Sequence, residues 1–384
     1  MKKRLALSDL ASGMKFTEDV LLDETNLFVP AGIAIRQKDL DMLGSWGVTH
    51  VLTAGELLED APDSGPAAPD AERADGIRPN PFAGDRELYR EYVDMVDRLA
   101  VVFDRVGRNE KVEPRTVDSI VQDLLRVVRD KQADLVSAIL SGEIAANDYA
   151  RAGVDTAILS IVVGTAIKLP TWRLAYLATG ALLHDLGMAR VPDSIVKKKG
   201  ELAEDEVQKM RAHPLLSYRI ITKELMYPDE VGLPGLQHHE RWDGEGYPRR
   251  SPGKEVDLLS RIVSVVDAFE AMVSEKPYRN SMIGYAAMKN LLSDNSRRFD
   301  PEILKAFIRA MGIYPIGSLV LLNNAAIAKV VGIHADAPLR PKIRVVVDEF
   351  GKRYADDGGA VLDLLKEKTI FVARALDPRD VARK

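Results

Sequence analysis

The sequence predicts a mainly α-helical protein with a small mixed α and β module at its N-terminus and a small β module at its C-terminus. Between residues 86 and 311, apolar residues recur at steps of three and four, which is the spacing of amphipathic helices. Residues 1–60 and 313–384 instead hold short apolar runs that end at turn-forming residues, as strands do. Residues 61–84 contain five prolines among Ala, Asp and Gly, a composition typical of a linker.

The N-terminal module is predicted from short strands and one helix. Strands are expected at 15–16, 19–22 and 26–32, and the last of them runs into a Pro-Ala-Gly turn. A helix is expected at 37–43, and His50–Thr53 is expected to form a closing strand.

The helical part begins with two long amphipathic segments. Leu88, Tyr92 and Met95 share one face of the first helix, and a second helix over 117–128 follows Pro114. These helices, within 86–131, could pair between two chains and so form a homodimer. Further helices are expected at 132–141, 147–168, 172–184, 204–212, 215–225, 258–273, 283–293 and 301–311. Together they predict a bundle of roughly eight to ten helices.

The C-terminal part changes from helical to strand-like spacing. Strands are expected at 318–322, 326–331 and 342–347, with turns at 323–324 and 348–351.

These segments predict five regions along the chain. They are an N-terminal α+β module (1–60), a Pro/Ala-rich linker (61–84), a helical connecting region (85–145), a central helical domain (146–312) and a small C-terminal β module with its tail (313–384).

Composition excludes several classes of protein. The 384 residues include no cysteine, which rules out disulfides, zinc–thiolate sites and cysteine nucleophiles. The net charge of −5 does not suit a bulk nucleic-acid binder, so DNA is not an expected partner. No signal peptide is evident, and no apolar run approaches the roughly 20 residues of a membrane helix, so no membrane partner is expected either. We therefore expect a cytoplasmic protein.

Four of the six histidines fall between residues 184 and 239. Neutral imidazoles and carboxylates are ligands that iron, manganese and zinc prefer, so this concentration points to a metal site. His184 and Asp185 follow the apolar run of the predicted helix 172–184, and Gly187 is expected to end or bend that helix. Adjacent helical residues point about 100° apart, so this pair could serve two neighbouring metals, and the two oxygens of Asp185 could bridge them.

Three further positions extend the set. His238 and His239 are adjacent and stand beside a glycine-rich turn, and Asp267 lies in an otherwise apolar helical run. A carboxylate in such a run must be paired, protonated or bound to a metal. Taken alone, Asp267 could instead form a buried salt bridge with an Arg or Lys, and His213 could be a surface or helix-capping residue.

In this order the motifs resemble the HD-GYP family, a branch of the HD phosphohydrolase superfamily. The matching motifs lie within about 145–310. They include His184-Asp185-Leu186-Gly187, His213-Pro214, His238-His239-Glu240, Gly246-Tyr247-Pro248 and Asp267-Ala268-Phe269. The resemblance implies an HD-type helical bundle with two or three divalent metals, usually iron or manganese. It also implies hydrolysis of cyclic di-GMP to pGpG or GMP, and a diguanylate cyclase with a GGDEF domain as a further partner.

The same resemblance implies roles for individual residues. Asp185 would bridge the metals and take part in catalysis. The remaining metal ligands would be His213, His238 and His239 at one site, and His184 and Asp267 at the other.

Substrate contacts are also implied by the resemblance. Tyr247 in the Gly-Tyr-Pro loop would face the substrate and contribute to catalysis, and Lys276 and Arg279 would lie near the phosphates. Trp242 would either touch a base or shape the loop.

Two positions depart from the family pattern. The family normally has a histidine about 32 residues before the His-Asp pair, where this chain has Ala152; Asp148, one helical turn earlier, could serve as a ligand instead. The family also has a lysine where this chain has Met188, and methionine cannot supply that charge to a phosphate. The alternative to an active phosphodiesterase is therefore a degenerate signalling module that binds cyclic di-GMP or a protein partner.

Overall fold

The computed structural model describes residues 3–11, 13–18, 20–21, 27–29, 35, 50–57, 85–141, 149–198, 200–274, 283–293, 297–354 and 358–377. The chain forms two compact units, Met1–Ala74 and Asp75–Lys384. The predicted helix at 37–43 and the predicted linker at 61–84 lie outside the described residues.

The first unit contains a four-stranded antiparallel sheet. Its strands are, in spatial order, β1 (Lys3–Ala6), β4 (His50–Thr53), β2 (Val20–Leu21) and β3 (Leu27–Val29). These confirm the strands expected at 19–22, 26–32 and 50–53, in shorter form for the first two.

The 15–16 segment is the exception in this unit. Phe16 forms only an isolated bridge with Leu57, and its ring packs in a small core with Val20, Ile35 and Val51.

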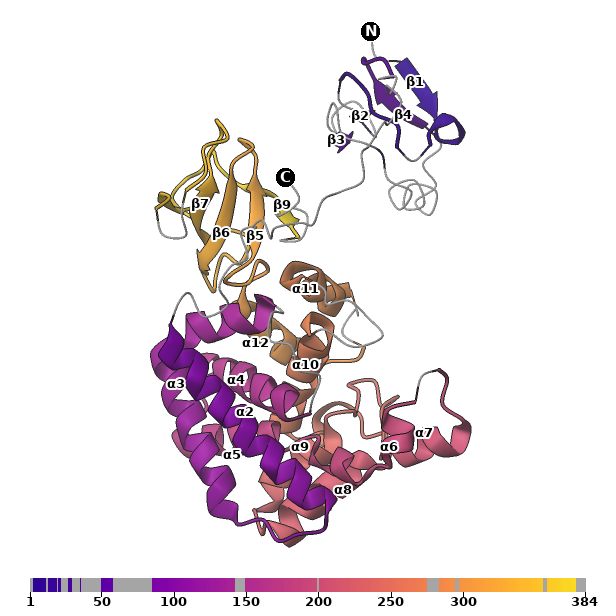
Figure 1. Cartoon of the computed structure of the whole chain (residues 1–384), viewed down its shortest axis with the longest axis vertical. Coiled ribbons are helices and arrows are strands. Elements are labelled where there is room, and N and C mark those ends of the chain that lie inside the picture. Colours follow the sequence, from indigo (N-terminus) through magenta and orange to yellow (C-terminus); the bar gives the residue numbers. More distant parts are fainter. Residues whose placement is uncertain are drawn as a thin grey trace, which may run out of the picture. The chain divides into compact units, whose positions relative to one another are not determined.

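The second unit is mainly helical (Figure 1). Two short segments, η2 (Leu186–Arg190) with 3₁₀ geometry and η3 (Ile220–Glu224) with π geometry, connect longer helices. The helices are α2 (Arg86–Gly107), α3 (Pro114–Ser141), α4 (Tyr149–Ala166), α5 (Thr171–Leu182), α6 (Asp193–Val196), α7 (Glu204–Met210), α8 (His213–Arg219), α9 (Asp229–Gln237), α10 (Leu258–Val273), α11 (Gly284–Ser293) and α12 (Pro301–Met311).

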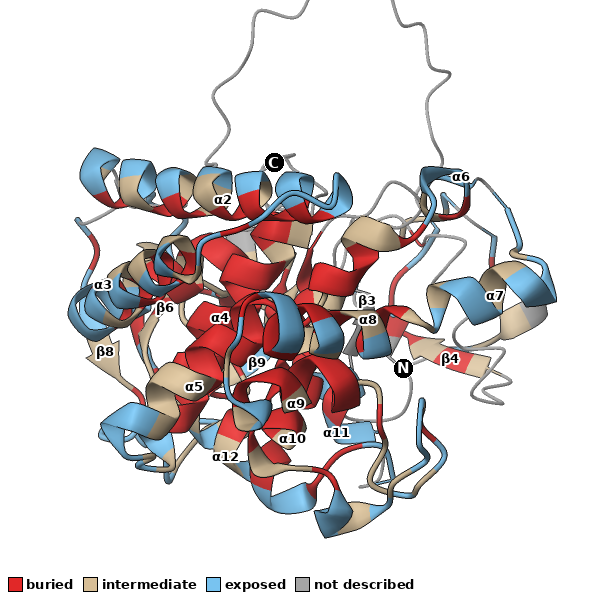
Figure 2. Cartoon of the chain, turned by 90° about the horizontal axis from the view of Figure 1, so that it is seen from below, coloured by how far each residue is buried: buried red, intermediate tan, exposed pale blue. Residues whose placement is uncertain are grey.

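Helix α4 is the core of this bundle. Its sequence is rich in Ala, Val and Ile with no polar stripe, so it is apolar all round and is buried on nearly every side (Figure 2). Helices α2, α3, α5 and α10 pack against it. Helix α2 shows the opposite pattern, with one buried face and one exposed face, as its periodicity predicts.

A buried polar group joins α2 to α4. The Tyr92 hydroxyl donates to Asp155 Oδ1 at 2.8 Å, and Arg151 Nε lies 3.4 Å from Asp155 Oδ2. All three side chains are at least 96% buried, since their exposures are 1%, 0% and 4% in that order. Burying charges is costly unless they are paired, so this group fixes how α2 docks on the core helix.

The helices expected at 117–128 and 132–141 are confirmed: they meet at a kink at Lys131 (φ −136°) within α3. The bundle differs from the prediction elsewhere. Helix α5 ends at Leu182, so the His-Asp pair lies in a turn after the helix. Helix α9 was not predicted, because Gly232, Pro234 and Gly235 hide its helical character.

The C-terminal part is a five-stranded antiparallel sheet (Figure 1). Its strands, in spatial order, are β8 (Val361–Asp363), β7 (Lys342–Val347), β6 (Ile327–Gly332), β5 (Leu319–Leu322) and β9 (Val372–Leu376). Three of them confirm the strands expected at 318–322, 326–331 and 342–347.

Together, the bundle and the two small modules confirm the predicted mainly α fold class. Among the helices that the structure describes, none combines the length and apolarity needed to cross a membrane. The five-region division of the chain stays a prediction.

Candidate metal centre

Four elements of the second unit bring the predicted ligands together. His184 and Asp185 lie in the turn between α5 and η2, and His213 is the first residue of α8. His238 directly follows α9, and Asp267 lies within α10. The residues span more than eighty positions of sequence, so only the packing of these helices makes them neighbours.

Gly187 fixes the distance between η2 and α8. Its backbone N–H donates to Ser217 Oγ at 2.8 Å, and Ser217 is fully buried. A Cβ atom at residue 187 would lie 2.2 Å from the carbonyl oxygen of His213, closer than any side chain permits. Glycine therefore allows the two backbones that carry Asp185 and His213 to touch.

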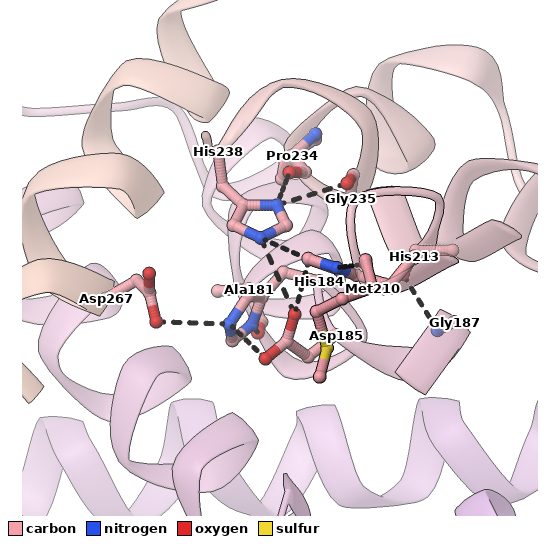
Figure 3. A network of polar contacts seen from close by, with 11 residues as sticks. Ala181, His184, Asp185, Gly187, Met210, His213, Pro234, Gly235, His238 and Asp267 are labelled. Atoms are coloured by element: carbon pink, nitrogen blue, oxygen red, sulfur yellow. Dashed lines mark hydrogen bonds and ion pairs between the residues drawn. The ribbon is translucent and has the colours of Figure 1, made fainter. Parts of the chain in front are cut away.

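Three histidines make the same kind of backbone contact through Nδ1 (Figure 3). Nδ1 of His184 lies 2.7 Å from the carbonyl oxygen of Ala181, and Nδ1 of His213 lies 2.7 Å from that of Met210. Nδ1 of His238 lies 2.9 Å from the carbonyl oxygen of Pro234. A carbonyl can only accept, so each Nδ1 carries a proton, and each Nε2 presents a lone pair when the imidazole is neutral. Hydrogen bonds of this kind orient histidine ligands around a metal.

The Asp185 carboxylate lies among these lone pairs. Its Oδ1 is 3.3 Å from His213 Nε2 and 3.5 Å from His238 Nε2, and its Oδ2 is 3.8 Å from His184 Nε2. The two imidazole nitrogens of His213 and His238 are 3.4 Å apart. Three hydrogen-bond acceptors thus face one another at hydrogen-bonding range, an arrangement that a metal ion between them or a proton on one imidazole would satisfy.

Asp267 adds a second carboxylate on the side of His184. Its Oδ1 is 3.5 Å from His184 Nε2. Burial opposes protonation of His184, but Asp185 and Asp267 outweigh it and raise the pKa of this imidazole to about 9. In turn, burial opposes ionisation of Asp267, but His184 outweighs it and lowers the pKa of this carboxyl to about 2. A proton and a metal ion therefore compete for the same lone pair, that of His184 Nε2.

His239 lies on the outer side of the cluster. Its ring centroid is 4.1 Å from that of His238 and 5.0 Å from that of His213. On another side it stacks on the Tyr247 ring at 4.7 Å. Burial and the neighbouring His238 lower the pKa of His239 to about 2, so its imidazole is neutral and able to bind a metal.

The donor set fits divalent metal ions. Among the described residues, two groups place ligand atoms within 4.8 Å of one another: His213, His238 and His239, and His184, Asp185 and His238. The buried atoms His184 Nε2 and Asp185 Oδ1 have no hydrogen-bond partner within the described part of the chain, although charged neighbours lie close. Bonds to a metal would satisfy both atoms. Nitrogen and oxygen donors of this kind suit iron, manganese or zinc.

The loop after His239, which reaches Ser251, holds Tyr247 against the cluster. The buried Glu240 carboxylate accepts from the backbone N–H of Arg249 at 2.7 Å and from that of Ser251 at 3.1 Å. A Cβ at Gly246 would lie 2.5 Å from the Cα of Glu240, so only glycine fits there. Glu240 thus anchors the loop from inside, a role that the sequence did not reveal because a lone glutamate carries no pattern.

The other predicted substrate residues are placed as follows. The Arg261 guanidinium lies 5.9 Å from the Trp242 ring, in a small pocket that Arg298 and Phe299 also line. None of the predicted metal ligands lines that pocket among the described residues, so the contact of Trp242 with a base stays a prediction. Lys276 and Arg279 lie outside the described residues.

The structure describes both positions that depart from the family pattern. Ala152 is half-buried in α4, and its neighbour Gly153 packs against the end of α5: a Cβ there would lie 2.6 Å from the carbonyl oxygen of Leu182. Met188 is buried in an apolar cluster. Neither side chain can bind a metal through nitrogen or oxygen, and Asp148 lies outside the described residues.

Comparisons with known proteins agree with this architecture. Residues 137–303 match a family model described as an HD domain, and residues 319–384 match one described as a KOW domain associated with HD domains. The chain is 27% identical over 263 residues to the cyclic di-GMP phosphodiesterase PdeB of Borreliella burgdorferi, covering 68% of this chain and 69% of that protein. It is 33% identical over 192 residues to a cyclic di-GMP phosphodiesterase of Pseudomonas aeruginosa, covering 50% of this chain but only 46% of the relative.

Among solved structures, an HDG"Y"P protein of Bdellovibrio bacteriovorus is similar at a TM-score of 0.48 and 14% identity, covering 80% of this chain and 98% of that one. The sequence relatives, the matched HD domain and the ordered His-Asp, His-His and Gly-Tyr-Pro motifs agree with one another. Residues 137–303 match the HD-domain family, and the ordered motifs within them are those of its HD-GYP branch.

Proposed function

We propose that the chain is a metal-dependent phosphodiesterase that hydrolyses cyclic di-GMP to pGpG or on to GMP. The observation that carries the proposal is the group of three acceptor atoms, Asp185 Oδ1, His213 Nε2 and His238 Nε2, which face one another within 3.3–3.5 Å. The names of the sequence relatives support cyclic di-GMP as the substrate.

A divalent ion in this centre, with iron or manganese the best match, would polarise the phosphate and lower the pKa of a water molecule. Asp185 is the residue suited to bridge two ions, because its two oxygens face different histidines. His213, His238 and His239 would hold one ion, and His184 and Asp267 the other. Asp148 is proposed as a ligand of a third ion.

Tyr247 is proposed to contact the substrate at the mouth of the centre. Its ring is held by stacking on His239, and burial together with Asp185 raises the pKa of its hydroxyl well above the ordinary value. The hydroxyl thus stays protonated and can donate a hydrogen bond to a phosphate oxygen. Lys276 and Arg279 are proposed as further phosphate contacts, and Trp242 as a base contact.

One experiment tests the proposal directly. The purified protein is loaded with Mn²⁺ or Fe²⁺, its metal content is counted, and cyclic di-GMP turnover is followed by chromatography of the products. Asp185→Asn and His239→Ala are expected to lose metal and to abolish turnover. His334→Ala is the matched control, because this histidine bonds to Asp363 in the C-terminal β module, at 2.8 Å.

The alternative of a degenerate signalling module finds no support in the comparisons. It makes a different prediction: tight binding of cyclic di-GMP by the metal-loaded protein without any product. That result would overturn the proposed activity. A diguanylate cyclase partner and a homodimer through the 86–131 helices stay predictions.

A further inference from the structure

Residue 188, three positions after Asp185, offers no positive charge to a substrate. The Met188 side chain is 7% exposed and packs in an apolar cluster with Val191 and Ile195. Met210, at the end of α7, packs against the same cluster. Residue 188 is therefore part of this apolar core and gives no charge to a substrate phosphate.

Most of the nearby described lysines are already paired. Lys197 Nζ lies 2.6 Å from Asp193 Oδ2, and Lys209 Nζ lies 2.9 Å from Asp205 Oδ2. Lys198 pairs with Glu206 in the same region. Each of these charges is neutralised by a neighbour on α6 or α7.

Arg211 differs from these lysines. It is exposed, it directly follows α7, and it precedes the buried His213 by two positions. No carboxylate among the described residues forms an ion pair with it. Its guanidinium carbon instead lies 5.1 Å from the centroid of the Tyr247 ring.

Tyr247 thus contacts Arg211 and the predicted ligand His239 through its ring. Tyr247 therefore lies next to both the exposed Arg211 and His239, whose ring in turn neighbours those of the buried His213 and His238. A guanidinium over an aromatic face is held by the ring quadrupole and keeps its N–H groups free to bind an anion.

We propose that Arg211 binds the second phosphate of a cyclic dinucleotide, the one that is not hydrolysed. The inference rests on the proposed function. A cyclic dinucleotide has two phosphodiester groups, and the metal ligands would hold the reacting one. Arg211, next to the Tyr247 ring, is suited to the other by its planar fork of donors.

The test compares two substrates and three variants. Cyclic di-GMP carries two phosphodiesters, whereas bis(p-nitrophenyl) phosphate carries one, so only the first can use a contact to a non-reacting phosphate. The variants are Arg211→Ala, Arg211→Lys and the control Lys209→Ala, which removes an equal charge two residues away. Metal content is measured for each variant before KM and kcat.

Arg211→Ala is expected to raise the KM for cyclic di-GMP by about tenfold to a hundredfold, the loss typical of one hydrogen bond to a charged group. Its kcat and its KM for bis(p-nitrophenyl) phosphate should match those of the wild type. Arg211→Lys should recover part of the lost affinity, and Lys209→Ala should behave as the wild type.

Three results would overturn the inference. They are an unchanged KM for cyclic di-GMP in Arg211→Ala, an equal loss on both substrates, and an equal loss in Lys209→Ala. If the wild type binds cyclic di-GMP without cleaving it, the proposed activity fails, and calorimetric Kd values for the same variants decide the role of Arg211. If the wild type does not bind cyclic di-GMP at all, both proposals fail.

Discussion

The buried carboxyl of Asp155 makes a specific prediction about pH and stability. Asp155 is fully buried between Tyr92 and Arg151 in the helical core. Burial raises its pKa, Arg151 opposes that rise and the nearby Glu270 adds to it, and the net pKa is about 7 instead of 3.8. The proposed change is Asp155→Asn, which removes the charge and keeps an oxygen that can accept from the Tyr92 hydroxyl.

The sign of the effect follows from proton binding in the two states. Between about pH 4 and 7 the folded protein holds a proton on Asp155 that the unfolded chain has released. The folded state therefore binds more protons, and the free energy of unfolding contributed by this group falls as the pH rises. At about 1.4 kcal/mol per pH unit, the difference between the two pKa values corresponds to about 4 kcal/mol.

The assay is urea unfolding of the wild type and the variant from pH 4 to pH 8, followed by circular dichroism. The unfolding free energy of Asp155→Asn minus that of the wild type is expected to rise by about 4 kcal/mol across this range. Asp97→Asn is the matched control on α2, because Asp97 is exposed. A rise of the same size in this variant would show that the effect does not come from the burial of Asp155.

The refuting result is equally specific. If the unfolding free energy of Asp155→Asn minus that of the wild type is flat between pH 4 and 8, the carboxyl is ionised throughout and Arg151 outweighs burial. If the difference falls with pH, the ion pair stabilises the core, and the account of burial given above is wrong.

Three substitutions near the metal centre give further predictions. Ser217→Ala leaves the buried N–H of Gly187 without an acceptor and should lower the unfolding free energy by about 1–3 kcal/mol in urea. Gly187→Ala should force η2 away from the carbonyl of His213. Metal titration should then show about tenfold to a hundredfold weaker binding, and unchanged metal binding would contradict the close packing of η2 against α8. Glu240→Ala removes the acceptor for the backbone N–H of Arg249, and it should lower the melting temperature and raise the KM for cyclic di-GMP. An unchanged KM would show that the loop holds its shape without the Glu240 carboxylate.

The spacing of apolar residues predicted most helices of the bundle. A helix with one buried face repeats apolar residues every three or four positions, and this repeat is visible in the sequence. Helix α2 is the clearest case, with Leu88, Tyr92 and Met95 all buried as the three- and four-residue steps require. Helix α9 was missed because Gly232, Pro234 and Gly235 are poor helix formers, and packing against neighbouring helices overrides that preference.

The candidate site was visible in the sequence only as a set of residue types in a particular order. The sequence by itself determined the nitrogen and oxygen donors, their order along the chain, and the losses at Ala152 and Met188. It could not place Asp185 between His213 and His238, because those contacts depend on three helices packing at one point. Only the tertiary structure decided which imidazole nitrogen faces inward and that Arg211 lies over Tyr247. Contacts across the fold depend on side-chain packing in three dimensions, which local spacing does not encode.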